Sequence, residues 1–287
     1  PLLLIFFYSC AGNSQDPTIS AVPDSKTILY NKPTNKTVVT LNSSQPGNWT
    51  LQYGVQDKNA PQTPKELKKS KWKSIKATVP GNVELDLMAE GLIKDPLVGN
   101  NVNDLRKYET YQWWYHRSFK KPIVPEGSRI ELNFDGIDTF ADIWLNNQKI
   151  GHVENMLVEH RLDITDYLKD KNELYICIYS TVLEARKHRL QEMGERYNAL
   201  AEAVSVRKPG HMFGWDILPR LISAGLWKDV KLEIIPPTYW ESVYWVTKWV
   251  WVEDRKADLY VNWQFQTDRI DIDDLVLRIS LRRNGKI

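Results

Sequence analysis

Residues 141–153, ADIWLNNQKIGHV, consist of two strand-like runs that meet at Asn146-Asn147. Two asparagines between extended runs are a hairpin signal, because asparagine tolerates the positive φ angles that a two-residue turn requires. The stretch SRIELNF just before them has apolar residues at every second position, which is typical of a strand with one buried face. These positions are Ile130, Leu132 and Phe134. The middle of the chain therefore predicts an all-β fold.

The flanking sequence extends this prediction in both directions. NWTLQY before the hairpin, NELYICIYS after it and LWKDVKLEII further on each predict a strand, and Pro236-Pro237 marks the end of a domain. Residues 83–92 favour a short helix that ends at Gly91. Residues 182–201 favour a longer helix with one apolar face. That face carries Leu190, Met193, Tyr197 and Leu200.

Beyond Pro237, apolar residues alternate in three further runs, which predicts three half-buried strands of a second sandwich. The first run includes Trp245, Trp249 and Trp251, the second Leu259, Val261, Trp263 and Phe265, and the third Leu275, Leu277, Ile279 and Leu281. An aromatic face of this kind can bind a ligand, but the pattern favours core packing. Asn284-Gly285 is a hairpin signal without a return strand, so we expect a second domain that is incomplete and a chain that is cut at both ends.

The charge balance argues against polyanion binding. The chain has 38 basic and 36 acidic residues, a net charge of +2, so no overall field attracts nucleic acid or an anionic membrane. The lysine-rich run KELKKSKWKSIK, residues 65–76, is therefore interpreted as a solvated face. The chain has 12 Trp and 13 Tyr but only 7 Phe. Flat rings with a polar atom suit the faces of sugars, although they also suit an ordinary β core.

The N-terminus indicates export. Residues 1–10, PLLLIFFYSC, form an apolar run too short to span a bilayer, and they resemble the end of a bacterial lipoprotein signal with Cys10 as the lipidated residue. A plain signal segment with an incidental cysteine is the alternative. Residues 11–36 are polar and read as a linker. Cys177 is expected to be a buried thiol, and no disulfide framework or zinc spacing is present. We expect a lipoprotein of the periplasm or outer membrane.

Several separated motifs resemble the N-terminal part of glycoside hydrolase family 2 enzymes, most closely β-mannosidases. They are ATVPGNVELDLMAEGLIKDPLVGNN, WWYHRSF, LNFDGIDTFADIWLNNQKIG, DITDYL and FGWDILPRLISAGLWKDVKLE, in that order. The resemblance implies a galactose-binding-like jelly-roll domain over residues 37–236 and a truncated immunoglobulin-like domain over 237–287. It also implies a (β/α)₈ barrel with two catalytic glutamates, which this chain lacks. No catalytic residue, metal site or cofactor is assigned to the chain.

The same resemblance gives a role to the stretch HMFGWDILPRLISAGLW, residues 211–227. It implies that Asp216 reaches the mouth of the barrel and accepts hydrogen bonds from hydroxyls of the terminal sugar, while Trp215 orients it or lines the pocket. Two purely structural alternatives stay open. Asp216 can pair with Arg220 four residues on or cap local backbone donors, and Trp215 and Phe213 can fill the core. Ile217 and Leu218 stand where β-mannosidases carry a second Trp and a Gly, which puts the preferred sugar in doubt.

Other acidic and aromatic residues receive no functional role. Glu192 and Glu195 favour a solvated helix face, and Asp135 and Asp138, on either side of Gly136, favour a turn. The adjacent rings of Trp113, Trp114 and Tyr115 must point to opposite faces of a strand, so we expect at least one in the core and leave open that one is exposed.

The resemblance thus implies the non-catalytic N-terminal part of a retaining exo-glycosidase, most closely a β-mannosidase, that acts on terminal β-mannosyl residues. This part should be inactive by itself. Its expected partners are carbohydrate and the downstream barrel, with no nucleic acid and with membrane contact only through the lipid anchor. The alternatives are a stand-alone carbohydrate-binding module and a surface β-sandwich lipoprotein.

Overall fold

The computed structural model describes residues 5–6, 36–45, 47–188 and 198–273. The chain divides into two compact units. One unit comprises residues 38–124 and 129–234, and the other comprises residues 1–37, 125–128 and 235–287.

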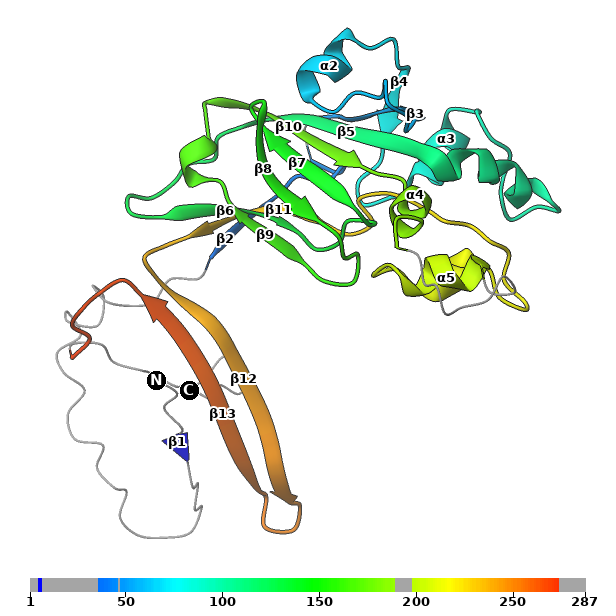
Figure 1. Cartoon of the computed structure of the whole chain (residues 1–287). Coiled ribbons are helices and arrows are strands. Elements are labelled where there is room, and N and C mark those ends of the chain that lie inside the picture. The colour runs from blue at the N-terminus through cyan, green and yellow to red at the C-terminus, as the bar shows by residue number, and fades with distance from the viewer. Residues whose placement is uncertain (1–4, 7–35, 46, 189–197, 274–287) are drawn as a thin grey trace, which may run out of the picture. The chain divides into compact units, whose positions relative to one another are not determined.

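The first unit is a sandwich of two antiparallel sheets (Figure 1). The six-stranded sheet has the order β4 (Ser74–Ala77), β3 (Trp49–Val55), β5 (Tyr111–Lys120), β10 (Lys171–Ile178), β7 (Ala141–Leu145) and β8 (Gln148–Val153). The four-stranded sheet has the order β2 (Thr37–Thr40), β11 (Val230–Ile235), β6 (Arg129–Phe134) and β9 (His160–Asp163). Every strand that was predicted for this unit is present, and LWKDVKLEII supplies β11.

The hairpin predicted at Asn146-Asn147 is confirmed. Leu145 pairs with Gln148, and the two asparagines have φ angles of 52° and 68°. Such angles in both turn residues match the right-handed twist of the flanking strands. Asn146 also fixes the turn to neighbouring segments, because its side-chain amide donates to the Tyr167 carbonyl at 2.9 Å and its oxygen accepts from the Glu173 amide at 3.1 Å. The turn residues therefore set the register of β7 and β8.

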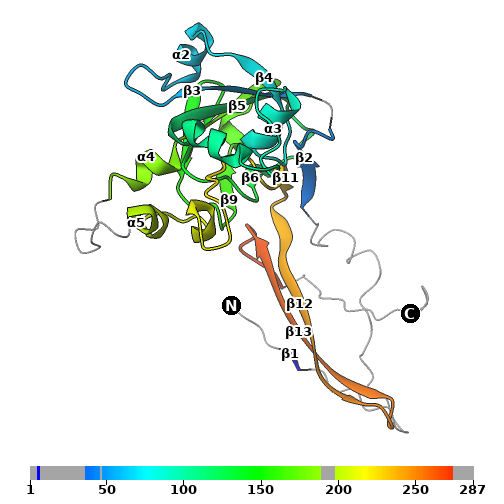
Figure 2. The ribbon, with the colours of Figure 1, turned by 90° about the vertical axis from the view of Figure 1, so that its right-hand side faces the viewer.

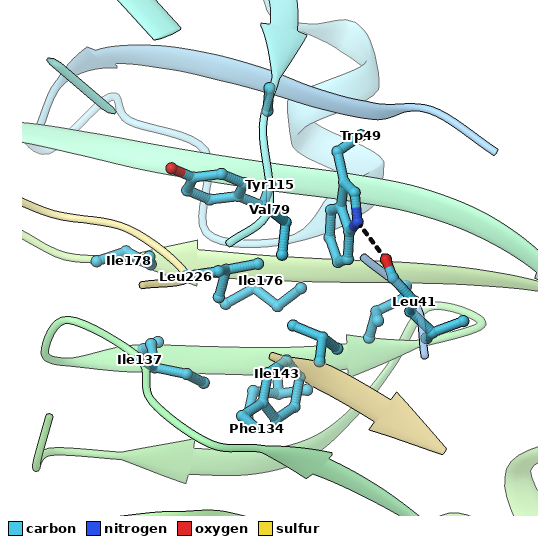
Figure 3. Packing of buried hydrophobic residues seen from close by; sticks show 14 of the residues in the cluster. Leu41, Trp49, Val79, Tyr115, Phe134, Ile137, Ile143, Ile176, Ile178 and Leu226 are labelled. Atoms are coloured by element: carbon cyan, nitrogen blue, oxygen red, sulfur yellow. Dashed lines mark hydrogen bonds between the residues drawn. The ribbon is translucent and has the colours of Figure 1, made fainter. Parts of the chain in front are cut away.

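Apolar side chains from both sheets fill the space between them (Figure 3). Trp49 and Tyr115 come from the six-stranded sheet and Phe134 from the four-stranded sheet, and all three are buried. The Trp49 Nε1 atom donates to the Leu41 carbonyl at 2.6 Å, so the polar edge of this ring is satisfied inside the core. Burial of these alternating residues is the main driving force for the sandwich.

The rings at 113–115 point to opposite faces as predicted, but none is exposed. Trp113 and Tyr115 enter the main core, and Trp114 joins Leu67 and Cys177 in a smaller cluster. Leu67 belongs to α2 (Pro64–Lys69), which covers the outer face of β5 and β10 there.

The prediction of a buried Cys177 thiol is confirmed, and burial raises its pKa well above the ordinary value. The lysines of the 65–76 run are all exposed, as expected for a solvated face.

The helices are short. Asn82 caps α3 (Val83–Ala89) by accepting from the Leu85 amide at 2.9 Å, and Gly91 ends the turn with a φ of 68°, which confirms the helix predicted over 83–92. The remaining helical segments are η1 (Asn101–Thr110), η2 (Thr165–Tyr167), α4 (Thr181–Ala185), α5 (Asn198–Val204) and η4 (Gly210–Phe213). Within the described ranges, none is both long enough and apolar enough to cross a membrane.

The prediction of one continuous helix over residues 182–201 is wrong, because the helix stops after its first residues. The helix α4 ends at Ala185, and the exposed residues 186–188 continue as a turn. Val182 and Ala185 bury their side chains, but the polar residues that follow offer no apolar face to bury, so packing does not support further helix. Leu190, Met193 and Tyr197 lie outside the described residues, as do Glu192 and Glu195, and Leu200 falls within α5.

The second unit contains a long antiparallel ribbon of β12 (Thr238–Trp251) and β13 (Lys256–Thr267), with β1 (Ile5–Phe6) on the other side of β13 (Figure 2). One face of β13 is half-buried as predicted, with Val261 at its centre. The predicted core packing of the β12 tryptophans is not found in the described chain, where Trp249 is 62% exposed and Trp245 and Trp251 are also exposed. The physical reason is that no facing sheet covers them there. The third predicted strand, over 275–281, and Asn284-Gly285 lie outside the described residues.

Candidate functional site

The segment over residues 209–223, here called the Asp216 loop, is a narrow loop closed by backbone hydrogen bonds. It leaves η4 at Gly214, whose φ of 102° favours glycine. The amide and carbonyl of Trp215 both bond to Leu218, at 3.0 and 3.2 Å, so Asp216 and Ile217 form the tip of a tight turn. The Leu221 amide donates to the Met212 carbonyl at 2.9 Å and closes the base. The loop therefore has a defined shape.

Asp216 is exposed at the tip, and within the described residues its carboxylate has no hydrogen bond or ion pair. The alternative in which it pairs with Arg220 or caps local donors is therefore not realised. Trp215 is 63% exposed, so it does not fill the core, whereas Phe213 does. The role of Asp216 and Trp215 in sugar binding stays a prediction, and the structure presents both side chains to solvent.

Arg220 is held by two carboxylates away from the turn. Its Nε and Nη2 atoms donate to the two oxygens of Glu109 at 2.8 Å each, and Nη2 also donates to Glu202 at 2.7 Å. The Arg220 side chain is only 8% exposed, and it lies over the Phe213 ring at 5.5 Å. Burial by itself lowers the pKa of Arg220, but the bonds to Glu109 and Glu202 outweigh it and raise that pKa above the ordinary value. Three segments of the chain are thus joined at one guanidinium.

A second buried ion pair fixes the other end of the loop. The Lys208 side chain is fully buried, and its Nζ atom donates to both oxygens of Asp138 and, at 2.8 Å, to the Ser223 carbonyl. Burial lowers the pKa of Lys208, and the Asp138 carboxylate opposes that shift. The interpretation of Asp138 as a turn residue is wrong, because its backbone forms an antiparallel β-bridge with Gly225 and its side chain is buried in this pair. Asp135 does lie near the surface, where it binds Lys231 at 2.6 Å.

Two more buried carboxyl groups lie on α3. Glu84 accepts from the Ser223 hydroxyl at 2.6 Å, and burial raises its pKa. Asp86 accepts from the Thr78 amide at 2.8 Å, and burial raises its pKa to about 6. Its other oxygen is buried and has no hydrogen-bond partner in the described part of the chain. One of the two, Glu84, therefore contacts the base of the Asp216 loop directly.

Three motifs that are far apart in the sequence meet at this base. The Asp138 amide donates to the Gly225 carbonyl at 2.9 Å. A Cβ atom on Gly225 would lie 2.6 Å from the Gly81 carbonyl oxygen, and one on Gly136 would lie 2.4 Å from the Trp227 Nε1 atom. Only glycine permits such close approach. The VPGN, FDGID and AGLW motifs are thus required by the packing that carries the loop.

The arrangement at the loop tip can bind hydroxyl groups. An exposed carboxylate on a fixed loop can accept hydrogen bonds from two neighbouring hydroxyls. The described residues contain no group of three or more His, Cys, Asp or Glu side chains that could hold a metal ion. Figures 1 and 2 show α3, α4 and α5 at the same end of the sandwich, and the partners of the loop come from this end.

Sequence reasoning missed the residues that anchor the loop. Lys208 and Asp138 are 70 positions apart, and Arg220 and Glu109 are 111 positions apart. Charged residues are frequent in this chain, so one sequence offers no signal for which of them pair. The one hint is the position of Asp138 in the stretch GIDTFA, which has no other charged residue.

The comparisons with known proteins identify the family of this chain. The family model described as "Glycosyl hydrolase 2 galactose-binding domain-like" matches residues 49–228. The chain is 41% identical over 168 residues to β-mannosidase B of Emericella nidulans, which covers 57% of this chain and 20% of that protein. It is 40% identical over 159 residues to β-mannosidase B of Thermothelomyces thermophilus, covering 54% of this chain and 19% of that protein.

Solved structures show the same fold. The crystal structure of β-D-mannosidase from Dictyoglomus thermophilum matches with a TM-score of 0.64 and 29% identity over 80% of this chain and 26% of that chain. The exo-chitosanase of Amycolatopsis orientalis matches with a TM-score of 0.54 at 19% identity, covering 83% of this chain and 25% of that chain, which supports the fold alone. The predicted fold class, an all-β jelly roll followed by an immunoglobulin-like domain, is confirmed.

The matches cover a small share of each relative but a large share of this chain. The chain spans about a fifth of the length of the curated relatives it matches. The family model, by contrast, covers more than half of this chain. The chain therefore belongs to the glycosyl hydrolase 2 galactose-binding domain-like family.

Proposed function

We propose that this chain is the N-terminal, non-catalytic part of a retaining exo-β-mannosidase that removes terminal β-mannosyl residues. The proposal is supported by the relatives named β-mannosidase B and by the β-D-mannosidase structure, to which this chain is similar. Retention requires a nucleophilic carboxylate and an acid carboxyl about 5–5.5 Å apart. We propose that a downstream barrel domain supplies both groups, so that residues 1–287 alone are inactive.

Within this enzyme, Asp216 accepts hydrogen bonds from hydroxyls of the terminal sugar and Trp215 lines the pocket. The observation that carries this proposal is the exposed carboxylate at the tip of a fixed loop, with no partner among the described residues. A free carboxylate that is already held in place binds a hydroxyl without first giving up another bond and without ordering the loop. The sandwich would thus contribute to specificity for the sugar.

The test is hydrolysis of an aryl β-mannoside by the polypeptide that joins residues 1–287 to the proposed barrel. We expect faster hydrolysis of the β-mannoside than of the β-galactoside or β-glucuronide. Asp216→Asn should lower kcat/KM by about tenfold or more, since hydrogen bonds to charged groups contribute about 1.5–3 kcal/mol. Asp166→Asn, at an exposed aspartate of η2, is the matched control and should leave kcat/KM unchanged. Equal activity of Asp216→Asn and wild type would contradict the proposal.

A stand-alone carbohydrate-binding module is the second candidate. It is favoured by the exposure of Trp215 directly beside Asp216, because an open indole face next to a carboxylate can bind a sugar. This candidate expects residues 1–287 to bind mannose or a mannan oligosaccharide in calorimetry. The enzyme proposal expects no binding that can be measured without the barrel.

We also propose that the protein is an exported lipoprotein anchored through Cys10. The support is the apolar run before Cys10 and the polar segment after it. Labelling of cells that express the protein with a tagged fatty acid should mark the wild type. Cys10→Ser should carry no label, and a labelled Cys10→Ser protein would exclude this anchor.

A further inference from the structure

We infer that Glu109, Arg220 and Glu202 form a positioning cluster that keeps the Asp216 carboxylate available for substrate. The cluster does so by holding the Asp216 loop in place and by binding the loop's own cation. This inference rests on the proposed role of Asp216. Arg220 is a positioning residue in this account, because nothing places it in contact with the sugar.

The geometry ties the loop to two separate elements. Glu109 belongs to η1, Glu202 belongs to α5, and Arg220 lies in the Asp216 loop two residues after Leu218. The two bonds from Arg220 to Glu109 are parallel, a pattern that restricts the guanidinium plane as well as its position. Arg186 binds the other oxygen of Glu202 at 2.8 Å, so the second carboxylate is itself oriented. The base of the loop is thereby tied to both neighbouring helical segments.

The second role follows from competition for one cation. Arg220 is the only Lys or Arg between Lys208 and Lys228, and it lies four residues after Asp216. A free loop would allow Asp216 and Arg220 to pair, as the sequence alone suggested. Glu109 and Glu202 are only 12% exposed, whereas Asp216 is exposed. Ion pairs are stronger where water is excluded, so the two buried carboxylates outcompete the exposed one.

Loss of the cluster should therefore have two effects. The loop should open more often, because its base loses three hydrogen bonds to charged groups. In variants that keep Arg220 but weaken its partners, the guanidinium should also become free to bind Asp216. Both effects reduce the fraction of molecules in which the carboxylate can accept from a sugar hydroxyl.

The first experiment is hydrogen exchange on the 287-residue chain, which needs no enzyme activity. Arg220→Gln should speed amide exchange in residues 212–221 by about tenfold or more, while exchange in β7 and β10 stays unchanged. Arg161→Gln is the matched control, because Arg161 binds Glu159 at 2.8 Å on the same sandwich but does not contact the loop. Unchanged exchange of residues 212–221 in Arg220→Gln would overturn the inference. If amides of β7 and β10 also exchange faster in Arg220→Gln, the Glu109→Gln variant is measured in place of Arg220→Gln. Unchanged exchange of residues 212–221 in Glu109→Gln would then overturn the inference.

The second experiment is a double-mutant cycle in the polypeptide with the proposed barrel, assayed on an aryl β-mannoside. Arg220→Gln should lower kcat/KM by about tenfold in the wild type but by less than about twofold in Asp216→Asn, because it acts through that carboxylate. Arg220→Lys should recover part of the loss, since Lys keeps the charge but not the paired geometry. Equal losses in both backgrounds would show a merely structural role and overturn the inference. An Asp216→Asn variant with full activity would instead contradict the proposed function, and the exchange experiment would still judge whether the cluster holds the loop.

Discussion

The interior of the sandwich and the Asp216 loop are stabilised by different kinds of interaction. Between the sheets, buried side chains such as Phe134 and Ile143 contact one another through apolar surface alone. The loop is instead held by buried ion pairs, of Lys208 with Asp138 at one end and of its own Arg220 with Glu109 and Glu202. Apolar packing tolerates many substitutions of similar volume, whereas a buried ion pair requires both partners in one geometry.

This difference has a functional meaning. A sandwich core needs only to be filled, but a loop that presents one carboxylate must hold it in a particular place. Buried ion pairs often contribute little net stability, yet they disfavour every arrangement that separates the partners. The comparison teaches that the charged groups at the base of the loop specify its position, while the apolar core supplies the free energy of folding.

The largest expected effect is in the core. Phe134→Ala should lower the free energy of unfolding by about 4 kcal/mol, because it removes a fully buried ring and leaves a cavity. Urea denaturation followed by circular dichroism measures this loss. A loss below about 1 kcal/mol would mean that the interior is not close-packed around Phe134.

The buried pair at the loop base should come next. Lys208→Met should cost about 3 kcal/mol, since it leaves Asp138 charged and unpaired in the interior. Adding Asp138→Asn to Lys208→Met should recover part of this loss, because the uncompensated charge is then removed. Urea denaturation of the two single variants and the double variant gives the interaction free energy between Lys208 and Asp138. Additive losses would contradict a direct ion pair.

A smaller effect is expected in how the stability of the fold depends on pH. Asp86 has a folded-state pKa of about 6, above its ordinary value of 3.8, so the folded chain binds this proton more tightly than the unfolded chain. Its contribution to stability is therefore present below about pH 4 and is lost as the pH rises to about 6. Asp142 and Glu173 have lowered pKa values and act in the opposite direction, with a contribution that is lost as the pH falls.

Asp86→Asn isolates this group, because the opposing carboxylates are the same in both proteins. The wild type should lose about 1–2 kcal/mol relative to Asp86→Asn between pH 4 and pH 7, where each pKa unit corresponds to about 1.4 kcal/mol at most. Melting temperatures of the two proteins across this range measure the difference. A constant difference would show that Asp86 does not titrate there.

The smallest effect on stability is expected at the loop tip. Trp215→Ala should change the free energy of unfolding by less than about 0.5 kcal/mol, because the ring is mostly exposed and fills no core space. The same urea denaturation as for Phe134→Ala provides the measurement. A loss comparable to that of Phe134→Ala would remove the distinction between loop and core.

The sequence predicts the core far better than the loop base. Strands such as β6 and β7 follow from the alternation of apolar residues, since one buried face imposes a period of two on the chain. The hairpin at Asn146 and the cap at Asn82 follow from local backbone chemistry. The helix predicted over 182–201 failed where packing stops, at Ala185, because periodicity does not reveal which apolar residues find a partner.

The candidate site was predictable only in part. Resemblance pointed to Trp215 and Asp216, and the structure adds that both are exposed. The pairing of Arg220 with Glu109 could not be inferred, because it depends on how η1 and the loop meet in space. For the same reason, Asp138 resembled a turn residue until its contact with Lys208 was known.

The central claim is that the Asp216 carboxylate binds a hydroxyl of the substrate, and the most direct test removes each of these two groups in turn. In the polypeptide with the proposed barrel, kcat/KM of wild type and Asp216→Asn is measured on an aryl β-mannoside and on analogues that each lack one hydroxyl. We predict that Asp216→Asn costs about 1.5–3 kcal/mol on the parent substrate and close to nothing on the analogue that lacks the bound hydroxyl. An equal cost on every analogue would contradict the claim that this carboxylate binds the substrate.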